Sequence, residues 1–130
     1  MFSVILATLI TMQATPADYK FESAQHGLDE GYVRLSIIPQ NGFKWGKDYN
    51  AVLTLQSSRN VVLSKTRFTN KGGDFSQEGT TAYVDIPFKV TDFEEHTITG
   101  TISFLVCNDT RCTPQRNVRV QFVVVGEVGC

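Results

Sequence analysis

The chain has 130 residues, which suits a single domain with a hydrophobic core of its own. Its 12 basic and 13 acidic residues leave a formal net charge of −1, and the basic residues are dispersed along the sequence. This charge pattern argues against a nucleic-acid or anionic-lipid partner, since both require a concentrated basic surface.

The chain begins with an apolar run of the length found in secretory signal peptides. The run extends from Phe2 to Met12, is followed by the small residues Ala14 and Ala17, and is too short to span a bilayer as a helix. We therefore predict a signal peptide over residues 1–17 and an exported domain over residues 18–130, periplasmic or secreted, with no membrane insertion of the mature chain. Alternatively, the run is a buried first strand, because the basic residues that normally precede such a run are missing.

From Tyr19 onward, apolar and polar residues alternate in short segments that are separated by turn residues at intervals of about ten. Pro87 within one of these segments predicts an edge strand or a bulge. No segment has the pattern of an amphipathic helix. The pattern predicts an all-β fold, an immunoglobulin-like antiparallel β-sandwich. The predicted strands include segments 33–37, 51–56, 61–66, 82–88, 98–106 and 118–124.

Segment 42–49 concentrates three aromatic residues, Phe43, Trp45 and Tyr49, and contains the only tryptophan of the chain. Aromatic residues in such a loop ordinarily cap the end of a sandwich core. If they are exposed, they form a recognition surface instead, because rigid rings bury a large area with little loss of conformational entropy. The three residues are therefore candidate partner-binding residues, and their exposure decides between the two interpretations.

Two further motifs carry weaker signals. Asp92, Glu94 and Glu95 form a small acidic group before His96, which is more typical of a solvated turn than of a metal or acid–base site. The tripeptide 108–110 fits the glycosylation sequon, which matters only in a eukaryotic secretory pathway. The sequence shows no arrangement typical of a hydrolase or a nucleotide-binding protein.

Cys107 and Cys112 carry the most information about function. They flank the polar segment 108–111 between two strand-like segments, so we predict that they lie on either side of a β-hairpin loop. If they face each other across the ladder, their Cβ atoms approach closely enough for a disulfide. Such a bridge closes a ring of about six residues, stabilises by only about 2 kcal/mol in the loop-entropy model, and lies at an accessible position.

Three roles are open for this pair: a structural staple, a redox-active disulfide, or part of a metal site. A metal site is the weakest of the three, because only His26, His96 and Cys130 remain as further His or Cys ligands and they are scattered along the chain. No metal and no other cofactor is predicted. A non-enzymatic exported interaction module with a structural hairpin disulfide is the alternative to a thiol:disulfide oxidoreductase.

Two segments resemble the disulfide bond corrector family and the related N-terminal periplasmic domain of the thiol:disulfide interchange protein DsbD. One is segment 42–55 with its aromatic loop, and the other is segment 100–114, in which a glycine and an apolar strand precede the cysteine pair and Thr113-Pro114 follows it. The resemblance covers most of the chain after Tyr19. It implies an immunoglobulin-like domain that passes reducing equivalents to disulfide isomerases or thioredoxin-like proteins through Cys107 and Cys112.

The resemblance also implies roles for individual residues and partners. Cys112 would form the mixed disulfide with partners, Cys107 would act as the resolving thiol, and Phe68, Phe75 and Tyr83 are candidates for shielding the sulfur atoms.

DsbD carries its own membrane and thioredoxin-like domains, whereas here a separate membrane protein is expected as the electron donor. The cysteine spacing is one residue shorter than in the closest DsbD relatives, which could alter the loop geometry and the potential.

Overall fold

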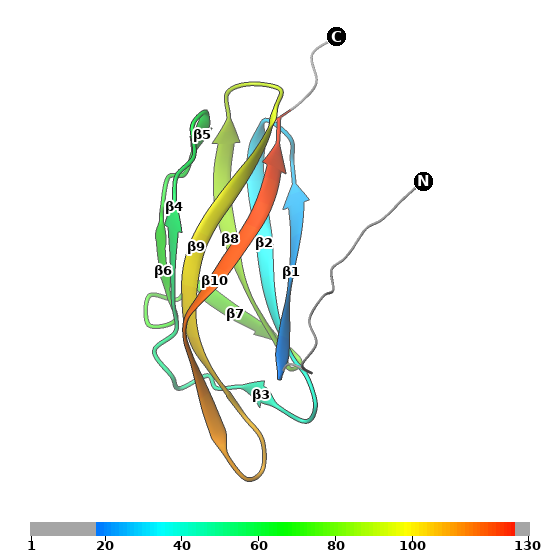
Figure 1. Cartoon of the computed structure of the whole chain (residues 1–130), viewed down its shortest axis with the longest axis vertical. Coiled ribbons are helices and arrows are strands. Elements are labelled where there is room, and N and C mark those ends of the chain that lie inside the picture. The colour runs from blue at the N-terminus through cyan, green and yellow to red at the C-terminus, as the bar shows by residue number, and fades with distance from the viewer. Residues whose placement is uncertain (1–17, 127–130) are drawn as a thin grey trace, which may run out of the picture.

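The computed structural model describes residues 18–126, and all regular structure in this range is β-strand (Figure 1). The predicted signal peptide over residues 1–17 and the terminal Cys130 lie outside the described residues. None of the described segments forms a helix long and apolar enough to cross a membrane. In chain order the strands are β1 (Tyr19–His26), β2 (Glu30–Pro39), β3 (Lys44–Trp45), β4 (Val52–Gln56), β5 (Val61–Val62), β6 (Arg67–Thr69), β7 (Phe75–Glu78), β8 (Thr81–Val90), β9 (Glu95–Cys107) and β10 (Cys112–Val125).

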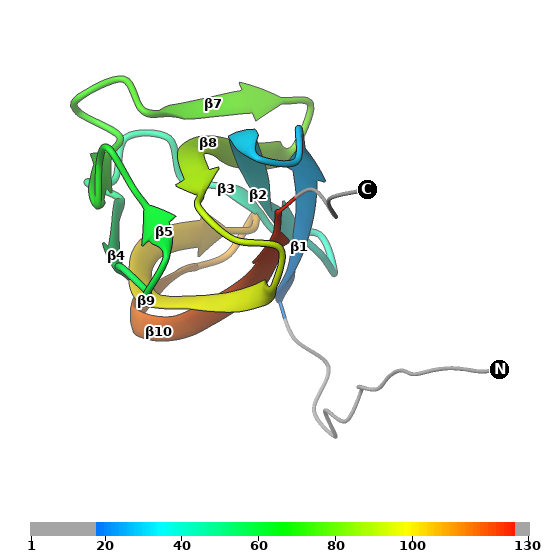
Figure 2. The ribbon, with the colours of Figure 1, turned by 90° about the horizontal axis from the view of Figure 1, so that it is seen from above.

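The strands form two antiparallel sheets of five strands each. Sheet A has the order β1-β2-β8-β5, with β7 also paired to β8. Sheet B has the order β10-β9-β4-β6, with β3 also paired to β9. Both sheets curl, and seen along the length of the molecule they face each other around a common interior (Figure 2). The all-β prediction is confirmed at this level.

The core lies between the two curled sheets and follows the alternation of the sequence. In β2, Val33, Leu35 and Ile37 point inward and are at most 2 % exposed, whereas Arg34 points outward. On the outer face Arg34 forms a bidentate ion pair with Asp85, directly across the β2–β8 ladder, at 2.8 and 3.0 Å. The buried apolar residues of both sheets form one cluster: Val33, Leu35, Ile37, Phe43, Trp45, Ala51, Leu53, Leu55, Val61, Phe68, Phe75, Ala82, Val84, Ile86, Phe88, Val90, Ile98, Ile102, Phe104, Val106, Val120, Phe122 and Val124.

The long β9–β10 hairpin spans the whole length of sheet B. Its tip projects beyond the other strands at one end of the molecule (Figure 1), and its pairing is regular except for a bulge between Gln115 and Val118. At the opposite end, the Gln25 side-chain amide joins β1 to β10. It donates to the Val125 carbonyl at 2.7 Å and accepts from the Val125 N–H at 2.9 Å. This amide ties the end of β10 to sheet A.

Two of the strand predictions need correction. Segment 61–66 is not one strand, because only Val61 and Val62 form β5, which pairs with β8 in sheet A, and the residues after them lead to β6, which pairs with β4 in sheet B. The chain crosses from sheet A to sheet B there. The alternation of apolar and polar residues in so short a segment gives no signal for this crossing. Pro87 does not lie on an edge strand, because β8 is paired on both sides. It falls between the pairing of β7, which reaches Val84, and that of β5, which starts at Lys89, so its missing N–H costs no ladder bond.

Candidate functional site

The tip of the β9–β10 hairpin brings the two predicted cysteines together. Cys107 ends β9, Cys112 begins β10, and the two residues lie directly opposite each other. Their Cα atoms are 4.0 Å apart and a disulfide joins their sulfur atoms. The predicted hairpin and the predicted bridge are therefore confirmed.

The loop between the cysteines is held by the side chain of Asn108. Its Oδ1 atom accepts hydrogen bonds from the N–H groups of Thr110 and Arg111, both at 2.9 Å, and from the Thr110 hydroxyl at 3.0 Å. The Asn108 N–H donates to the Arg111 carbonyl at 2.9 Å. Asparagine favours this position because its short side chain can bond the backbone two residues further on. The loop thus has a hydrogen-bonded framework that is independent of the disulfide.

The two cysteines differ in exposure. Val106 and Phe104 point into the core, so the alternation of β9 turns Cys107 to the outer face of sheet B. Cys107 is half-buried there, between β3 on one side and β10 on the other. Cys112 lies on the edge strand of the sheet and is exposed. Cys112 is therefore the more accessible end of the bridge.

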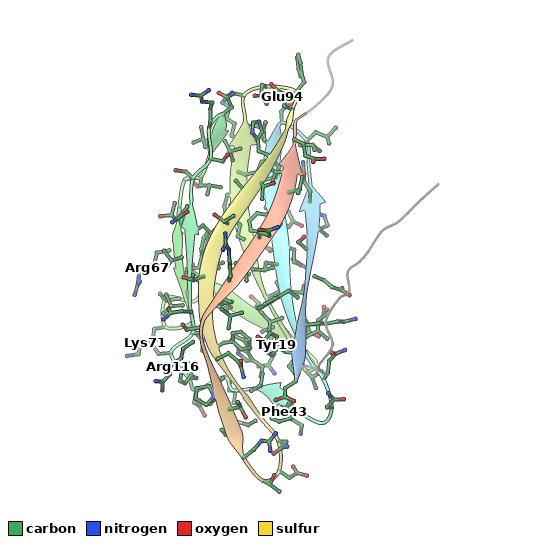
Figure 3. All side chains as sticks on the ribbon, viewed as in Figure 1. Tyr19, Phe43, Arg67, Lys71, Glu94 and Arg116 are labelled. Atoms are coloured by element: carbon green, nitrogen blue, oxygen red, sulfur yellow. A yellow bond between two sulfur atoms is a disulfide. The ribbon has the colours of Figure 1, made fainter. Side chains whose placement is uncertain are left out.

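The aromatic segment supplies core residues as well as surface residues. Phe43 and Trp45 are each only 6 % exposed, and the Trp45 ring stacks on Phe75 and Phe104 with ring centroids 5.6 and 5.7 Å apart. Both residues cap the core at the hairpin end of the molecule; Figure 3 labels Phe43 there. Tyr49 is half-buried. The role of the three aromatic residues in partner binding stays a prediction.

A groove of about 520 Å³ adjoins the disulfide. It brings Trp45 and Tyr49 together with both cysteines, whereas Phe43 does not line it and packs instead beneath Arg111, whose guanidinium lies 5.5 Å from the ring centroid. Such a volume is typical of a site for a small molecule or a few residues of a partner chain. The lining residues are Gly42, Lys44, Trp45, Gly46, Lys47, Asp48, Tyr49, Leu105, Cys107, Asn108, Asp109 and Cys112.

Gly46 positions the wall of this groove. Its N–H donates to the Leu105 carbonyl at 2.7 Å, which holds the segment after β3 against β9. A Cβ atom at this position would lie 2.9 to 3.1 Å from side-chain atoms of Leu105. Glycine therefore allows the close approach that forms the groove.

Lys44 is a site residue that sequence reasoning missed. It lies directly opposite Cys107 in the β3–β9 pair, and its side chain is exposed and lines the groove. Directly opposite residues share one face of a sheet, so Lys44, Cys107 and Cys112 form a row across three strands. Lys44 stands between the buried Phe43 and Trp45, and this alternation is the only local signal for its outward position.

The three candidates for shielding the cysteines lie elsewhere. Phe68 and Phe75 are buried in the core, and Tyr83 lies on the outer face of sheet A, where the Arg34 guanidinium sits 4.0 Å from its ring centroid. None of the three lines the groove. The groove beside the cysteines is bounded by β3, the loop that follows it and the hairpin itself.

The acidic group of residues 92–96 lies in a turn at the end of the molecule remote from the disulfide, where Figure 3 labels Glu94. His96 Nε2 lies 2.7 Å from Asp92 Oδ1, and Asn60 donates to Asp92 Oδ2 at 2.8 Å. The hydrogen bond with His96 is the main reason why the pKa of the Asp92 carboxyl lies below its ordinary value. Across residues 18–126, no three His, Cys, Asp or Glu side chains gather as a metal site requires.

Comparison with protein-family models, curated proteins and solved structures found no match to this chain.

Proposed function

We propose that this protein is an exported thiol:disulfide exchange domain that passes reducing equivalents to thioredoxin-like or disulfide isomerase partners through Cys107 and Cys112. The observation that carries the proposal is the position of the bridge: it lies at an exposed hairpin tip, beside a groove, with one cysteine on an open sheet edge. Exchange requires an accessible sulfur atom and a second cysteine that resolves the mixed disulfide. This hairpin supplies both.

The position of the bridge limits its contribution to the stability of the fold. β9 and β10 are already paired along their whole length apart from the bulge between Gln115 and Val118, and the loop is closed by the hydrogen bonds of Asn108. A ring of about six residues removes little entropy from the unfolded chain, which limits the stabilisation to about 2 kcal/mol. A disulfide that contributes little to stability and lies on the surface is better suited to exchange chemistry.

The row of Lys44, Cys107 and Cys112 supports a division of roles between the sulfur atoms. A thiolate of a partner attacks Cys112 Sγ, the Cys107–Cys112 bond breaks, and its electron pair stays on Cys107 Sγ as a thiolate beside the Lys44 ammonium. A second thiol of the partner then attacks the partner's own sulfur in the mixed disulfide and releases Cys112 as a thiolate. The partner dithiol is oxidised to a disulfide, and the domain disulfide is reduced to a dithiol; the same steps in reverse deliver electrons onward.

The proposal includes an immunoglobulin-like β-sandwich as the scaffold and a periplasmic or secreted location. The two facing antiparallel sheets with one shared core support the scaffold. Disulfides persist in oxidising compartments, so the bridge supports export, as does the apolar run within residues 1–17. A separate membrane protein supplies electrons in this scheme.

The reduction potential of the bridge tests the proposal. The purified protein carries Cys130→Ser, so that only one pair of thiols remains, and is equilibrated with thiol buffers of known potential. The fraction of reduced protein at each potential is then measured by alkylation. We expect a potential well above about −300 mV, because structural disulfides lie below that value. A potential below it would contradict exchange and favour an interaction module whose disulfide only braces the hairpin.

A further inference from the structure

The disulfide lies on a sheet edge that no described strand covers. β10 is the terminal strand of sheet B, and β9 is its only neighbour in the part of the chain that the structure describes. Cys112 is the first residue of β10 and is exposed. At the opposite end of β10 the Gln25 amide binds Val125, so the open part of the edge is the part that carries the cysteine.

The direction of the backbone groups along this edge follows from the hairpin. Opposite residues in an antiparallel pair alternate between hydrogen-bonded pairs and pairs without hydrogen bonds, with Cα atoms about 5.5 and 4.5 Å apart. The Asn108 N–H donates to the Arg111 carbonyl, so the next pair, Cys107 and Cys112, is one without hydrogen bonds. Its short Cα separation of 4.0 Å agrees. The N–H and C=O groups of Cys112 therefore point away from β9, toward the open edge.

The pairing of β9 with the chain on its other side, where β3 lies, supports the same direction of the backbone groups. Two residues before Cys107, the Leu105 carbonyl accepts from Gly46 on the β3 side, so the groups of β9 at these positions point away from β10. Pro114 lies opposite Leu105 and is again in a pair without hydrogen bonds. Its ring therefore occupies an outward position, where the missing N–H removes no bond of the ladder.

The open edge is short and has a defined set of bonding groups. The bulge between Gln115 and Val118, with Asn117 in a left-handed conformation at φ 52°, ends the regular strand. Before the bulge, the outward groups are the N–H and C=O of Cys112 and the C=O of Pro114. A strand that docks there can therefore form hydrogen bonds with one backbone donor and two backbone acceptors, two of which belong to the exposed Cys112.

We propose that a redox partner docks an extended segment antiparallel to residues 112–115 on this edge, with its reactive cysteine directly opposite Cys112. This inference rests on the proposed function and specifies how the partner binds. The partner cysteine donates its N–H to the Cys112 carbonyl and accepts from the Cys112 N–H, which places the two Cα atoms about 5.5 Å apart. That separation lies within the range of a disulfide.

The docked arrangement aligns the reacting atoms. Directly opposite residues share a face, so the sulfur atoms of the partner cysteine, Cys112 and Cys107 lie in a row across three strands. Thiol–disulfide exchange requires attack along the axis of the bond that breaks, and this row provides that path. The new bond forms between the partner sulfur and Cys112 Sγ, and the electron pair of the old bond leaves on Cys107 Sγ. Attack on Cys107 along the same axis would have to pass over β3, where Lys44 lies.

Synthetic peptides test the docking mode on the intact protein. The parent probe is the pentapeptide acetyl-Thr-Val-Cys-Val-Thr-amide, and two analogues carry one backbone N-methyl group each. N-methylation of the cysteine removes the donor to Cys112, whereas N-methylation of the following valine alters an N–H that points away from β10. We measure the rate of reduction of the Cys107–Cys112 bridge in the Cys130→Ser protein by alkylation and mass spectrometry. Each rate is divided by the rate of the same peptide with a small disulfide, so that intrinsic thiol reactivity cancels.

We expect the cysteine-methylated peptide to react about fivefold more slowly than the parent, the effect of one hydrogen bond, and the valine-methylated peptide to react like the parent. A Pro114→Ala variant adds an outward N–H and should speed the parent peptide about fivefold, whereas the matched Thr113→Ala variant, whose N–H points to β9, should not. If Pro114→Ala does not fold, the rates of the three peptides with the protein that retains Pro114 still test whether the peptide docks on the edge.

The outcomes separate docking from exchange. Equal normalised rates for the three peptides would overturn edge docking and leave the exchange function standing. A bridge that resists every peptide, and also thiol buffers poised at about −300 mV, would overturn the exchange function and the docking mode with it.

Discussion

Lys44 and Cys107 occupy directly opposite positions on β3 and β9, with both side chains on the outer face of sheet B. At such positions Cβ atoms lie about 4.5–5.5 Å apart, so the ammonium group can reach the Cys107 sulfur. A nearby positive charge stabilises a thiolate and hence the reduced form of the protein.

Reversing the charge of Lys44 should therefore make the bridge harder to reduce. We expect Lys44→Glu to lower the reduction potential by about 10–30 mV, because 30 mV corresponds to about 1.4 kcal/mol for a two-electron couple and an exposed charge contributes less than that. Arg59→Glu is the matched control, since it makes the same change of charge at an exposed position in the β4–β5 turn. Equal shifts in the two variants would show that only net charge matters.

The two cysteines should behave differently toward a partner. The probe is a thioredoxin-like protein that lacks its resolving cysteine and carries its remaining thiol as a thionitrobenzoate disulfide. We expect Cys107→Ser, which leaves the exposed Cys112 free, to form the mixed disulfide at least about fivefold faster than Cys112→Ser, as measured by thionitrobenzoate release. Both variants carry Cys130→Ser. Equal rates would refute the assigned roles.

Removing the bridge should cost little stability. The ring that it closes is short and the strands are already paired, so we expect Cys107→Ser/Cys112→Ser to lose about 2 kcal/mol or less in the free energy of unfolding. Urea unfolding followed by circular dichroism measures the change, with the Cys130→Ser protein as the reference. Loss of cooperative unfolding in the double variant would identify a structural bridge.

Acid stability should depend on the pair formed by Asp92 and His96. The hydrogen bond with His96 keeps the pKa of Asp92 below its ordinary value, so the ionised carboxylate stabilises the fold above about pH 4, where an unfolded aspartate is already ionised. This contribution is lost as the pH falls through the folded pKa. His96→Gln should raise the pKa of Asp92 and move acid unfolding to higher pH.

Two measurements check this expectation: NMR titration of the Asp92 carboxyl and an acid titration by circular dichroism. His26→Gln is the matched control. The His26 ring stacks on the Tyr32 ring, with ring centroids 4.7 Å apart, and forms no ion pair within residues 18–126. An acid midpoint that moves equally in both variants would contradict the role of the pair.

The hairpin could be predicted from the sequence because its two strands are long and bury every second residue on each side of the cysteines. The position of Lys44 could not. β3 has two residues, which is too few for any period to be recognised, and only its pairing with the distant Cys107 places Lys44 in the site. The crossing after β5 was missed for the same reason, since local alternation does not say which sheet a short strand joins.

The exposure of the aromatic segment also depends on distant residues. A loop with alternating aromatic residues has the same local pattern whether it caps a core or faces a partner. Trp45 is buried because Phe75 and Phe104, from the two different sheets, supply the surfaces on which it stacks. Phe43 is covered partly by Arg111 from the hairpin loop. Neither contact is encoded near segment 42–49.

The place of Trp45 gives the protein a built-in optical reporter of its own redox state. It is the only tryptophan in the chain, and it lines the same groove as Cys107 and Cys112. Opening of the bridge changes the surroundings of this groove, so the emission of the unlabelled protein should change when the bridge is reduced and stay constant in the Cys107→Ser/Cys112→Ser variant. Stopped-flow fluorescence can then follow the opening of this one bond in real time, with every residue of the groove left in its native form.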